Sequence, residues 1–240
     1  KIWAWNKRRV FRIKKYVDKL YVIFPFEKDI YSSYGIKANY FGNPIFENKH
    51  ENEKLEENVI ALLPGSRLQE IKKILPEMLK VVHQFPSYKF IVVKSSNICK
   101  SHYDKLIRKN SSKNIFISNE PTLEILRKSK AAAVTSGTAT LEAVKMNVPQ
   151  VVCYKTSKLN FYLAKFLLKI KYISLVNILL NKECVKELIQ NNLNPKKLSF
   201  ELNRLIDLNY SKKMVLDYKK IHGLLYQRNT SKKIATDILS

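Results

Sequence analysis

Glycine, cysteine and long apolar runs are all scarce in this 240-residue sequence. There are only five glycines, and neither a G-K-[ST] nor a G-x-G-x-x-G pattern occurs, which argues against ATP hydrolysis and dinucleotide redox chemistry. The three cysteines, Cys99, Cys153 and Cys184, are far apart, so they indicate neither a disulfide framework nor a zinc site and fit a reducing compartment. The four histidines are isolated. We therefore expect no metal and no cofactor.

No run of about 18 uncharged apolar residues occurs, so no membrane-spanning helix is expected. No signal peptide is visible either. The sequence is nevertheless 45% hydrophobic and 11% aromatic. That content is enough for the core of one large domain or two small ones.

Acidic residues are outnumbered by basic ones, 20 to 44, which gives a formal net charge of +24. Such a charge favours polyanionic partners, namely nucleic acid, an anionic lipid surface or a phosphorylated substrate. The excess is mostly lysine, in a chain also rich in asparagine and isoleucine, so a general compositional bias and a solvated surface are the alternative. No nucleic-acid-binding motif is recognisable, and we expect no nucleic-acid partner.

The first 58 residues divide into a basic segment, an apolar run and a polar linker. The segment 7–15 carries six positive charges and no acid, and the apolar run 20–26 predicts a strand. The stretch 42–58, "GNPIFENKHENEKLEEN", is polar and acidic and contains a proline, which is typical of a domain boundary.

Short apolar strands then alternate with helical patterns. This alternation predicts an α/β fold with a Rossmann-like parallel sheet covered by helices on both faces. Ligands of such sheets bind at the carboxyl ends of the strands, which here means the loops 64–67, 94–98 and 135–139. The expected strands cover 59–64, 89–93, 114–118, 131–136 and 149–154, the expected helices cover 67–84, 103–108, 122–129, 138–146 and 159–168, and only helices are expected from about Cys184 onward.

The first of these loops, "PGSR", has the composition of an anion site. Gly65 permits a sharp turn, and Ser66 could cap the next helix in a capping box with Gln69. Backbone N–H groups at a helix start attract an anion, and the Arg67 guanidinium could bind phosphate oxygens. The alternative is an ordinary cap with a surface arginine.

The second loop, "TSGTATLEAV", also delivers small polar residues from a strand into a helix. Gly137 allows close approach of a ligand to the backbone, and Ser136, Thr138 and the amides near them offer hydrogen-bond donors. Glu142 lies one turn after Thr138 and could accept both hydroxyls of a ribose diol. A small-residue turn with Glu142 facing solvent is the alternative. Two such loops in one sheet favour a nucleotide-diphosphate ligand.

A third region, Lys158 to Leu180, combines apolar residues with spaced lysines. Phe161, Lys165 and Lys169 could lie on a membrane-surface helix, or on a half-buried core helix whose lysines reach solvent. Asn177 interrupts the apolar run, so it is either a structural hydrogen-bonding residue or a ligand contact.

The basic segment near the amino end has two similar interpretations. On a predicted helix, Arg8, Arg12 and Lys15 share one face. That face could attract a membrane or a lipid phosphate, or it could be solvated.

Seven motifs in register resemble those of the lipid-A-disaccharide synthase family, over residues 2 to about 190. This resemblance implies an inverting glycosyltransferase of the GT-B architecture that joins UDP-2,3-diacylglucosamine to 2,3-diacylglucosamine 1-phosphate (lipid X), releasing UDP. It also implies a cytoplasmic enzyme at the inner membrane of a Gram-negative bacterium, without metal, and a homodimer is a further expectation. Another GT-B UDP-sugar enzyme, an epimerase or a glycosyltransferase, is the alternative. The motifs are "IWAWNKRRVFRIKKYVD", "FPFEKDIY", "FGNP", "ALLPGSRLQEI", "SGTATLEAV", "PQVVCYKTSKLNFYLAK" and "YISLVNILLNKECVKELIQ".

The resemblance assigns roles to residues whose positions match the family motifs. Arg67 corresponds to the arginine at the donor phosphates and Asn177 to an asparagine important for activity, and these two are the expected catalytic residues. Glu142 corresponds to the acid at the nucleoside. Glu187 and Gln190 correspond to the segment that closes over the donor. The remaining expected donor-binding residues are Gly65, Ser66, Ser136, Gly137, Thr138 and Ala139.

The family's amino-terminal motifs, Gly-Glu-x-Ser-Gly-Asp and the "G-x-D-x-P-D-F" segment with its proposed catalytic aspartate, do not occur in this sequence. We therefore expect a fragment that keeps the donor site and turns over poorly. Residues 1–46 would be a remnant of the acceptor-side domain, 47–225 the UDP-sugar domain, and 226–240 a helix packing back on the remnant.

Overall fold

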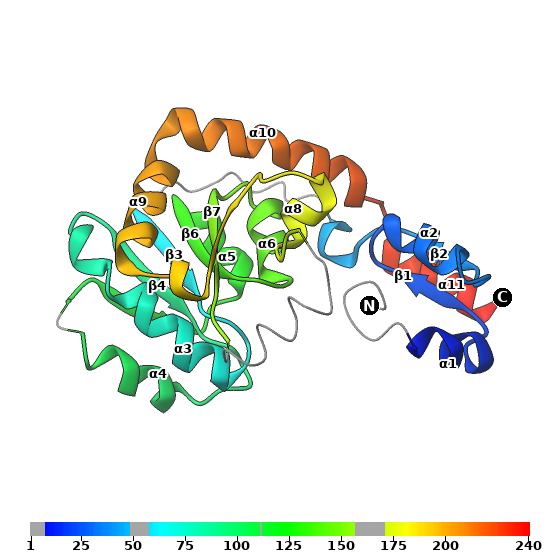
Figure 1. Cartoon of the computed structure of the whole chain (residues 1–240), viewed down its shortest axis with the longest axis horizontal. Helices are drawn as coiled ribbons and strands as arrows, with labels where there is room; N and C mark the ends of the chain where they lie inside the picture. Colours follow the sequence, from blue (N-terminus) through cyan, green and yellow to red (C-terminus); the bar gives the residue numbers. More distant parts are fainter. Residues whose placement is uncertain (1–7, 49–57, 111, 157–170) are drawn as a thin grey trace.

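The structure is a computed structural model that describes residues 8–48, 58–110, 112–156 and 171–240. It has a large lobe around a six-stranded sheet and a small lobe that holds the start of the described chain and its last helix (Figure 1). Helices cover both faces of the large sheet.

All six strands of the large sheet are parallel, in the order β5-β4-β3-β6-β7-β8. The first five agree with the strands predicted from the sequence to within one residue at either end, which confirms the parallel α/β class. The strands are β3 (Val59–Leu63), β4 (Lys89–Val93), β5 (Ile115–Ser118), β6 (Ala131–Thr135), β7 (Gln150–Tyr154) and β8 (Lys186–Ile189).

The expectation of helices alone after Cys184 is wrong, because β8 is a strand that pairs with β7. In β8 the buried side chain is Leu188, whereas Lys186, Glu187 and Ile189 are only partly covered. Such a short, half-charged edge strand gives no apolar run in the sequence.

The central strand β3 shows why continuous apolar runs are found here. Ile60 and Leu62 belong to one buried cluster, whereas Ala61 and Leu63 belong to another on the opposite face. Successive side chains point to opposite faces of a sheet, so a strand covered on both faces must be apolar throughout. All five β3 side chains are at most 5% exposed.

Amphipathic helices supply the two coverings. Helix α3 (Leu68–Leu79) buries an apolar stripe at helical spacing. Burial of each such side chain stabilises the folded state by about 1.5–3 kcal/mol. The single helix expected over 67–84 is instead α3 followed by the short turn η2 (Val82–Gln84), and the backbone leaves the helical region at Phe85, directly before Pro86. The buried stripe of α3 is Ile71, Ile74, Leu75, Met78 and Leu79.

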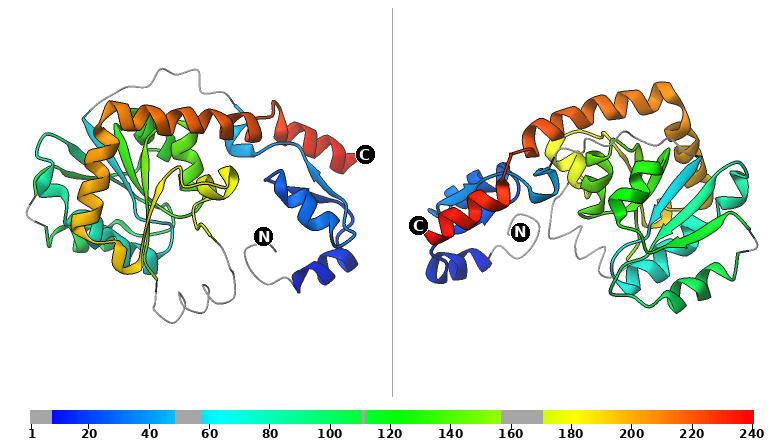
Figure 2. Two further views of the ribbon diagram at one scale, coloured as in Figure 1. Left: turned by 45° about the horizontal axis from the view of Figure 1, so that its top comes forward. Right: turned by 180° about the vertical axis from the view of Figure 1, so that it is seen from behind.

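The other helices of the large lobe follow the strands in turn. Helices α5 and α6 pack against each other, and α5 also contacts β3 and β4. Helix α9 packs on β6, β7 and β8 and also contacts α3. The long α10 crosses the large lobe and leads to the small one (Figure 2). The bounds are α4 (Lys100–Ile107), α5 (Thr122–Lys128), α6 (Ala139–Lys145), α8 (Leu175–Leu180), η3 (Gln190–Asn192), α9 (Pro195–Ile206) and α10 (Leu208–Leu225).

The small lobe is built on a two-stranded parallel sheet of β1 (Leu20–Val22) and β2 (Ala38–Tyr40). The apolar run 20–26 was expected to be one strand, but only its first three residues are extended, since helix α2 (Phe26–Ser32) begins at Phe26. Helix α1 (Arg9–Tyr16) precedes the sheet, and η1 (Pro44–Phe46) follows it.

The last helix, α11 (Thr230–Leu239), lies beside β1 and β2 in every view (Figures 1 and 2). The Tyr21 hydroxyl donates to Asp237 Oδ2 at 2.5 Å, and the Thr230 hydroxyl donates to the Phe41 carbonyl at 2.9 Å. The domain bounds at 46/47 and 225/226 stay a prediction.

The connections place a crevice between β3 and β6. The order in which strands are added to the sheet reverses here. From β3 the chain adds β4 and β5 on one side, and it then returns to the other side of β3 to add β6, β7 and β8. At such a reversal the two loops that follow the neighbouring strands separate and leave room for a ligand. These loops are the ones singled out in the sequence, 64–67 and 135–139.

Candidate functional site

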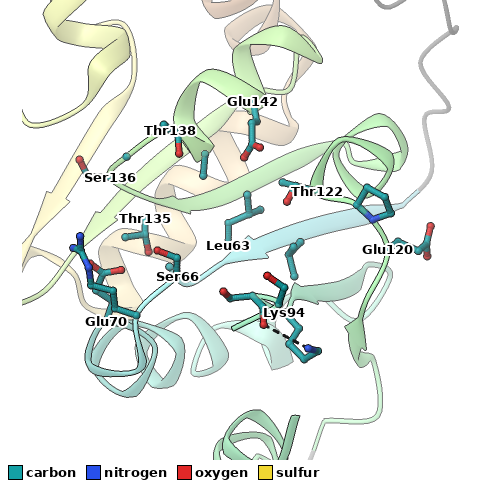
Figure 3. A pocket seen from close by; sticks show the side chains of 18 of the residues that line it. Leu63, Ser66, Glu70, Lys94, Glu120, Thr122, Thr135, Ser136, Thr138 and Glu142 are labelled. Atoms are coloured by element: carbon teal, nitrogen blue, oxygen red, sulfur yellow. Dashed lines mark hydrogen bonds and ion pairs between the residues drawn. The ribbon is translucent and has the colours of Figure 1, made fainter. Parts of the chain in front are cut away.

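A pocket of about 570 Å³ lies at the carboxyl ends of β3, β4, β5 and β6 (Figure 3). It brings eight of the expected donor-site residues together, namely Gly65, Ser66, Arg67, Ser136, Gly137, Thr138, Ala139 and Glu142.

In the 65–67 loop, Gly65 has a φ of +113°, which disfavours any residue with a side chain. The expected capping box of Ser66 and Gln69 is wrong, because α3 begins at Leu68 with Arg67 as its N-cap, and no side chain caps it. Ser66 therefore lies outside the cap and lines the pocket.

The Arg67 guanidinium pairs with a carboxylate of the same pocket. Its Nη1 lies 3.0 Å from Glu70 Oε1, and the arginine side chain is 81% exposed. An exposed pair of this kind contributes little to stability. Arg67 can therefore exchange Glu70 for an anionic ligand at small cost.

The 136–138 loop presents bare backbone to the pocket. Gly137 has a φ of +153°, and a Cβ added there would meet no atom within 4 Å. Within the described residues, the amides of Gly137 and Thr138 donate to no backbone or side-chain acceptor. These N–H groups are free to bind an anion.

Thr135, at the end of β6, carries an unpaired hydroxyl. The residue is 5% exposed, and its Oγ1 is buried without a hydrogen-bond partner among the described residues. Buried polar groups without a partner are rare and unfavourable. Because Thr135 also lines the pocket (Figure 3), a bound polar group could complete its hydrogen bonding.

Glu142 lies on α6 and lines the pocket near Thr122 and Thr138 (Figure 3). Burial raises the pKa of its carboxyl above the ordinary value, and the Lys145 cation lowers that pKa only in part. No hydrogen bond is formed by this carboxylate in the described part of the chain. Two hydroxyl donors from a ligand would satisfy the two carboxylate oxygens.

The structure does not bring Asn177, Glu187 or Gln190 into the pocket lining. The Asn177 amide is fully buried and bonds to β8 and the turn before it. The Glu187 carboxylate accepts from the amides of Ile173 and Ser174. Gln190 Oε1 accepts from the Thr156 amide at 2.9 Å.

Sequence reasoning missed a second set of pocket residues in the loops after β4 and β5. The loop 94–98 was singled out as a location, but no residue in it was assigned a role, and the loop after 114–118 was not considered. The same rule about the carboxyl ends of strands would have found both. The missed lining residues around these two loops are Val93, Lys94, Ser95, Ser96, Asn119, Glu120, Pro121 and Thr122. Leu63, Glu70 and Thr135, near the other two loops, also line the pocket without having been assigned a role.

The expected lipid-facing residues lie far from this pocket or outside the description. Arg8, Arg12 and Lys15 are exposed at α1, where Phe11 is 69% and Tyr16 is 68% exposed. Phe161, Lys165 and Lys169 lie outside the described residues. No helix in the described ranges is long and apolar enough to cross a membrane.

Similarity to known proteins was found at three levels. The family model described as lipid-A-disaccharide synthetase matches residues 1–238. The lipid-A-disaccharide synthase of Wigglesworthia glossinidia brevipalpis is 37% identical over 94% of this chain and 61% of its own length, and that of Acinetobacter baylyi is 31% identical over 95% and 64%. The chain thus spans about six-tenths of these relatives.

Among solved structures, S. aureus TarM in complex with UDP and glycan ligands is similar, with a TM-score of 0.61 at 15% identity, over 97% of this chain and 45% of that one. At this identity the likeness concerns the fold, and it confirms the GT-B class. Taken with the family model, these findings identify the chain: it belongs to the lipid-A-disaccharide synthetase family.

Proposed function

We propose that this pocket binds the UDP part of a UDP-sugar, and that the complete protein transfers a diacylglucosamine from UDP to lipid X. The observation that carries the proposal is one pocket that combines the pair of loops 65–67 and 136–138, the unpaired Thr135 hydroxyl and the partly buried Glu142. The first two suit a diphosphate and the third suits a ribose diol.

The diphosphate would lie between Arg67 and the amides of Gly137 and Thr138. The Arg67 side chain would leave Glu70, with which it is paired here, and bind phosphate oxygens in two-point fashion. Glu142 would accept the two ribose hydroxyls. The uracil would then extend toward the loops after β4 and β5.

The reaction proposed is a direct displacement with inversion. The 6-hydroxyl of the acceptor attacks the anomeric carbon from the face opposite UDP, the bond from that carbon to the diphosphate breaks, and the hydroxyl proton passes to a base. Arg67 and the loop amides stabilise the charge that develops on the diphosphate. The base, worth about 10²–10⁴-fold in rate, is proposed to lie in the part of the relatives' length that this chain does not span.

Calorimetry with UDP tests the proposed ligand. We expect the chain to bind UDP and Arg67→Gln to weaken binding about 10- to 100-fold, because a charged two-point contact contributes about 1.5–3 kcal/mol. Arg108→Gln, which removes an exposed arginine at the end of α4, is the matched control and should bind like the parent. Absence of UDP binding would overturn the proposal.

A membrane contact is proposed for α1. The exposed cations Arg12 and Lys15, with Arg8 just before the helix, are close in sequence to the exposed rings of Phe11 and Tyr16, a combination that suits an anionic bilayer surface. Such a contact fits the proposal that the enzyme works peripherally at the cytoplasmic face of the inner membrane. Sedimentation with anionic and with neutral vesicles tests it, and equal binding to both would contradict it.

A further inference from the structure

Asn177 has no hydrogen-bonding capacity left for a ligand. Its Nδ2 donates to the Val185 carbonyl and to Glu187 Oε1, both at 2.9 Å. Its Oδ1 accepts from the amides of Cys184 at 2.8 Å and Val185 at 2.9 Å. A carboxamide offers two donors and two acceptor sites, so all four are occupied within the protein.

The Glu187 carboxylate links Asn177 by hydrogen bonds to the backbone just before α8. Its carboxylate accepts from the Ile173 amide at 3.0 Å, from the Ser174 amide at 2.9 Å and from Asn177. Hydrogen bonds to an ionised acceptor are stronger than neutral ones. The backbone of Ile173 and Ser174 is therefore held at a fixed position relative to β8.

The Ile173 carbonyl in turn holds the pocket loop. It accepts from the Ser136 hydroxyl at 2.8 Å. A serine hydroxyl has one proton, so the Ser136 proton is used inside the protein rather than on a ligand. This bond therefore anchors the pocket loop that carries the unpaired amides of Gly137 and Thr138.

We infer that Asn177 and Glu187 are positioning residues, which act through Ile173 and Ser136 to hold the 136–138 loop in its anion-binding conformation. The inference rests on the proposed function, since it assumes that the pocket takes a diphosphate. It gives these two residues a role in binding that requires no contact with the ligand. Their influence must then pass through the Ser136 hydroxyl.

A double-mutant cycle tests that requirement. UDP affinity is measured by calorimetry for the full chain, Glu187→Gln, Ser136→Ala and the double variant. We expect Glu187→Gln to weaken UDP binding about tenfold, the effect of one displaced hydrogen bond to a charged group. In the Ser136→Ala background the same change should have less than about a twofold effect.

The control is Ser174→Ala. It removes the side chain that caps α8 by accepting from the Val176 amide, yet keeps the Ser174 backbone bond to Glu187. Ser174→Ala should bind UDP like the parent chain. If its affinity for UDP falls as much as that of Glu187→Gln, the weaker binding reflects a general loss of stability, and the inference is overturned. If the fold-increases in Kd of Glu187→Gln and Ser136→Ala simply multiply in the double variant, the two residues act independently, which would also overturn the inference.

Hydrogen exchange on the parent chain keeps the inference testable if Glu187→Gln does not fold. Saturation with UDP should slow exchange of the Ile173 and Ser174 amides, although neither residue lines the pocket, and Ser136→Ala should abolish that protection. UDP binding with unchanged exchange at both amides refutes the positioning role alone. Failure to bind UDP at all refutes the proposed function instead.

Discussion

Replacing Glu142 by glutamine should change stability and ligand binding in opposite directions. Burial raises the pKa of this carboxyl, so the folded state holds its charge less favourably than the unfolded chain does. The folded protein therefore loses stability as pH rises through the raised pKa, and regains it as pH falls to the ordinary range of a glutamate. Glu142→Gln removes this charge, so we expect a higher Tm at pH 7.5 and a smaller gain at pH 5.

Ligand binding should suffer from the same substitution. An ionised carboxylate accepting from two ribose hydroxyls makes two charge-assisted hydrogen bonds, and losing the charge should cost about 1.5–3 kcal/mol in all. That cost raises the Kd for UDP about 10- to 100-fold.

Calorimetry with UDP and with its 2′-deoxy analogue isolates the diol contact. The parent chain should favour UDP over the deoxy compound, and Glu142→Gln should bind both within about twofold of each other. Glu183→Gln, at an exposed glutamate paired with Lys186, is the matched control. An unchanged preference for UDP in Glu142→Gln would refute the assignment of Glu142 to the ribose.

Three further outcomes are expected. Thr135→Val should leave stability unchanged or raise it, since it removes a buried hydroxyl without a partner, and should weaken UDP binding in calorimetry; weaker folding with normal binding would contradict this. Gly65→Ala should lower stability by about 1–3 kcal/mol in denaturant unfolding, because φ is +113° and the new Cβ would lie 2.6 Å from Glu70 Oε2, whereas the control Gly223→Ala on helix α10 should not. Burial lowers the pKa of His222, so below about pH 6.5 the unfolded state binds more protons than the folded state, and the stability of the folded protein should fall as pH falls. In thermal unfolding, the Tm of His222→Gln should fall less over the same pH range.

The sequence predicted most clearly the strands that are buried on both faces, although the short, partly exposed edge strand β5 was also found from its isoleucines and Phe116. Strand β3 is apolar throughout, and β6 and β7 are apolar apart from Thr135 and Gln150 at their ends, because helices cover these strands on both sides. The strands β2 and β8 were missed because each buries few side chains, and Glu187 in β8 is a charged residue whose partners lie 10 to 14 positions away. No local pattern reveals such a pairing.

The site was predictable to the same extent. The loops 64–67 and 135–139 were predicted from their place after strands of a parallel sheet and from Gly65 and Gly137, whereas the strand order that makes them neighbours comes from the structure. The capping box failed because its spacing matched a helix start one residue too early. The structural use of Asn177 could not be read from the sequence, since it depends on a strand that the pattern did not predict.

The measurement that tests the central claim most directly is a crystal structure of this chain with UDP bound. We expect the diphosphate between Arg67 and the Gly137 and Thr138 amides, with Thr135 Oγ1 within hydrogen-bonding distance of a phosphate oxygen or a bridging water, and the ribose hydroxyls on Glu142. UDP bound elsewhere, or bound in this pocket with its phosphates directed away from both loops, would contradict the account.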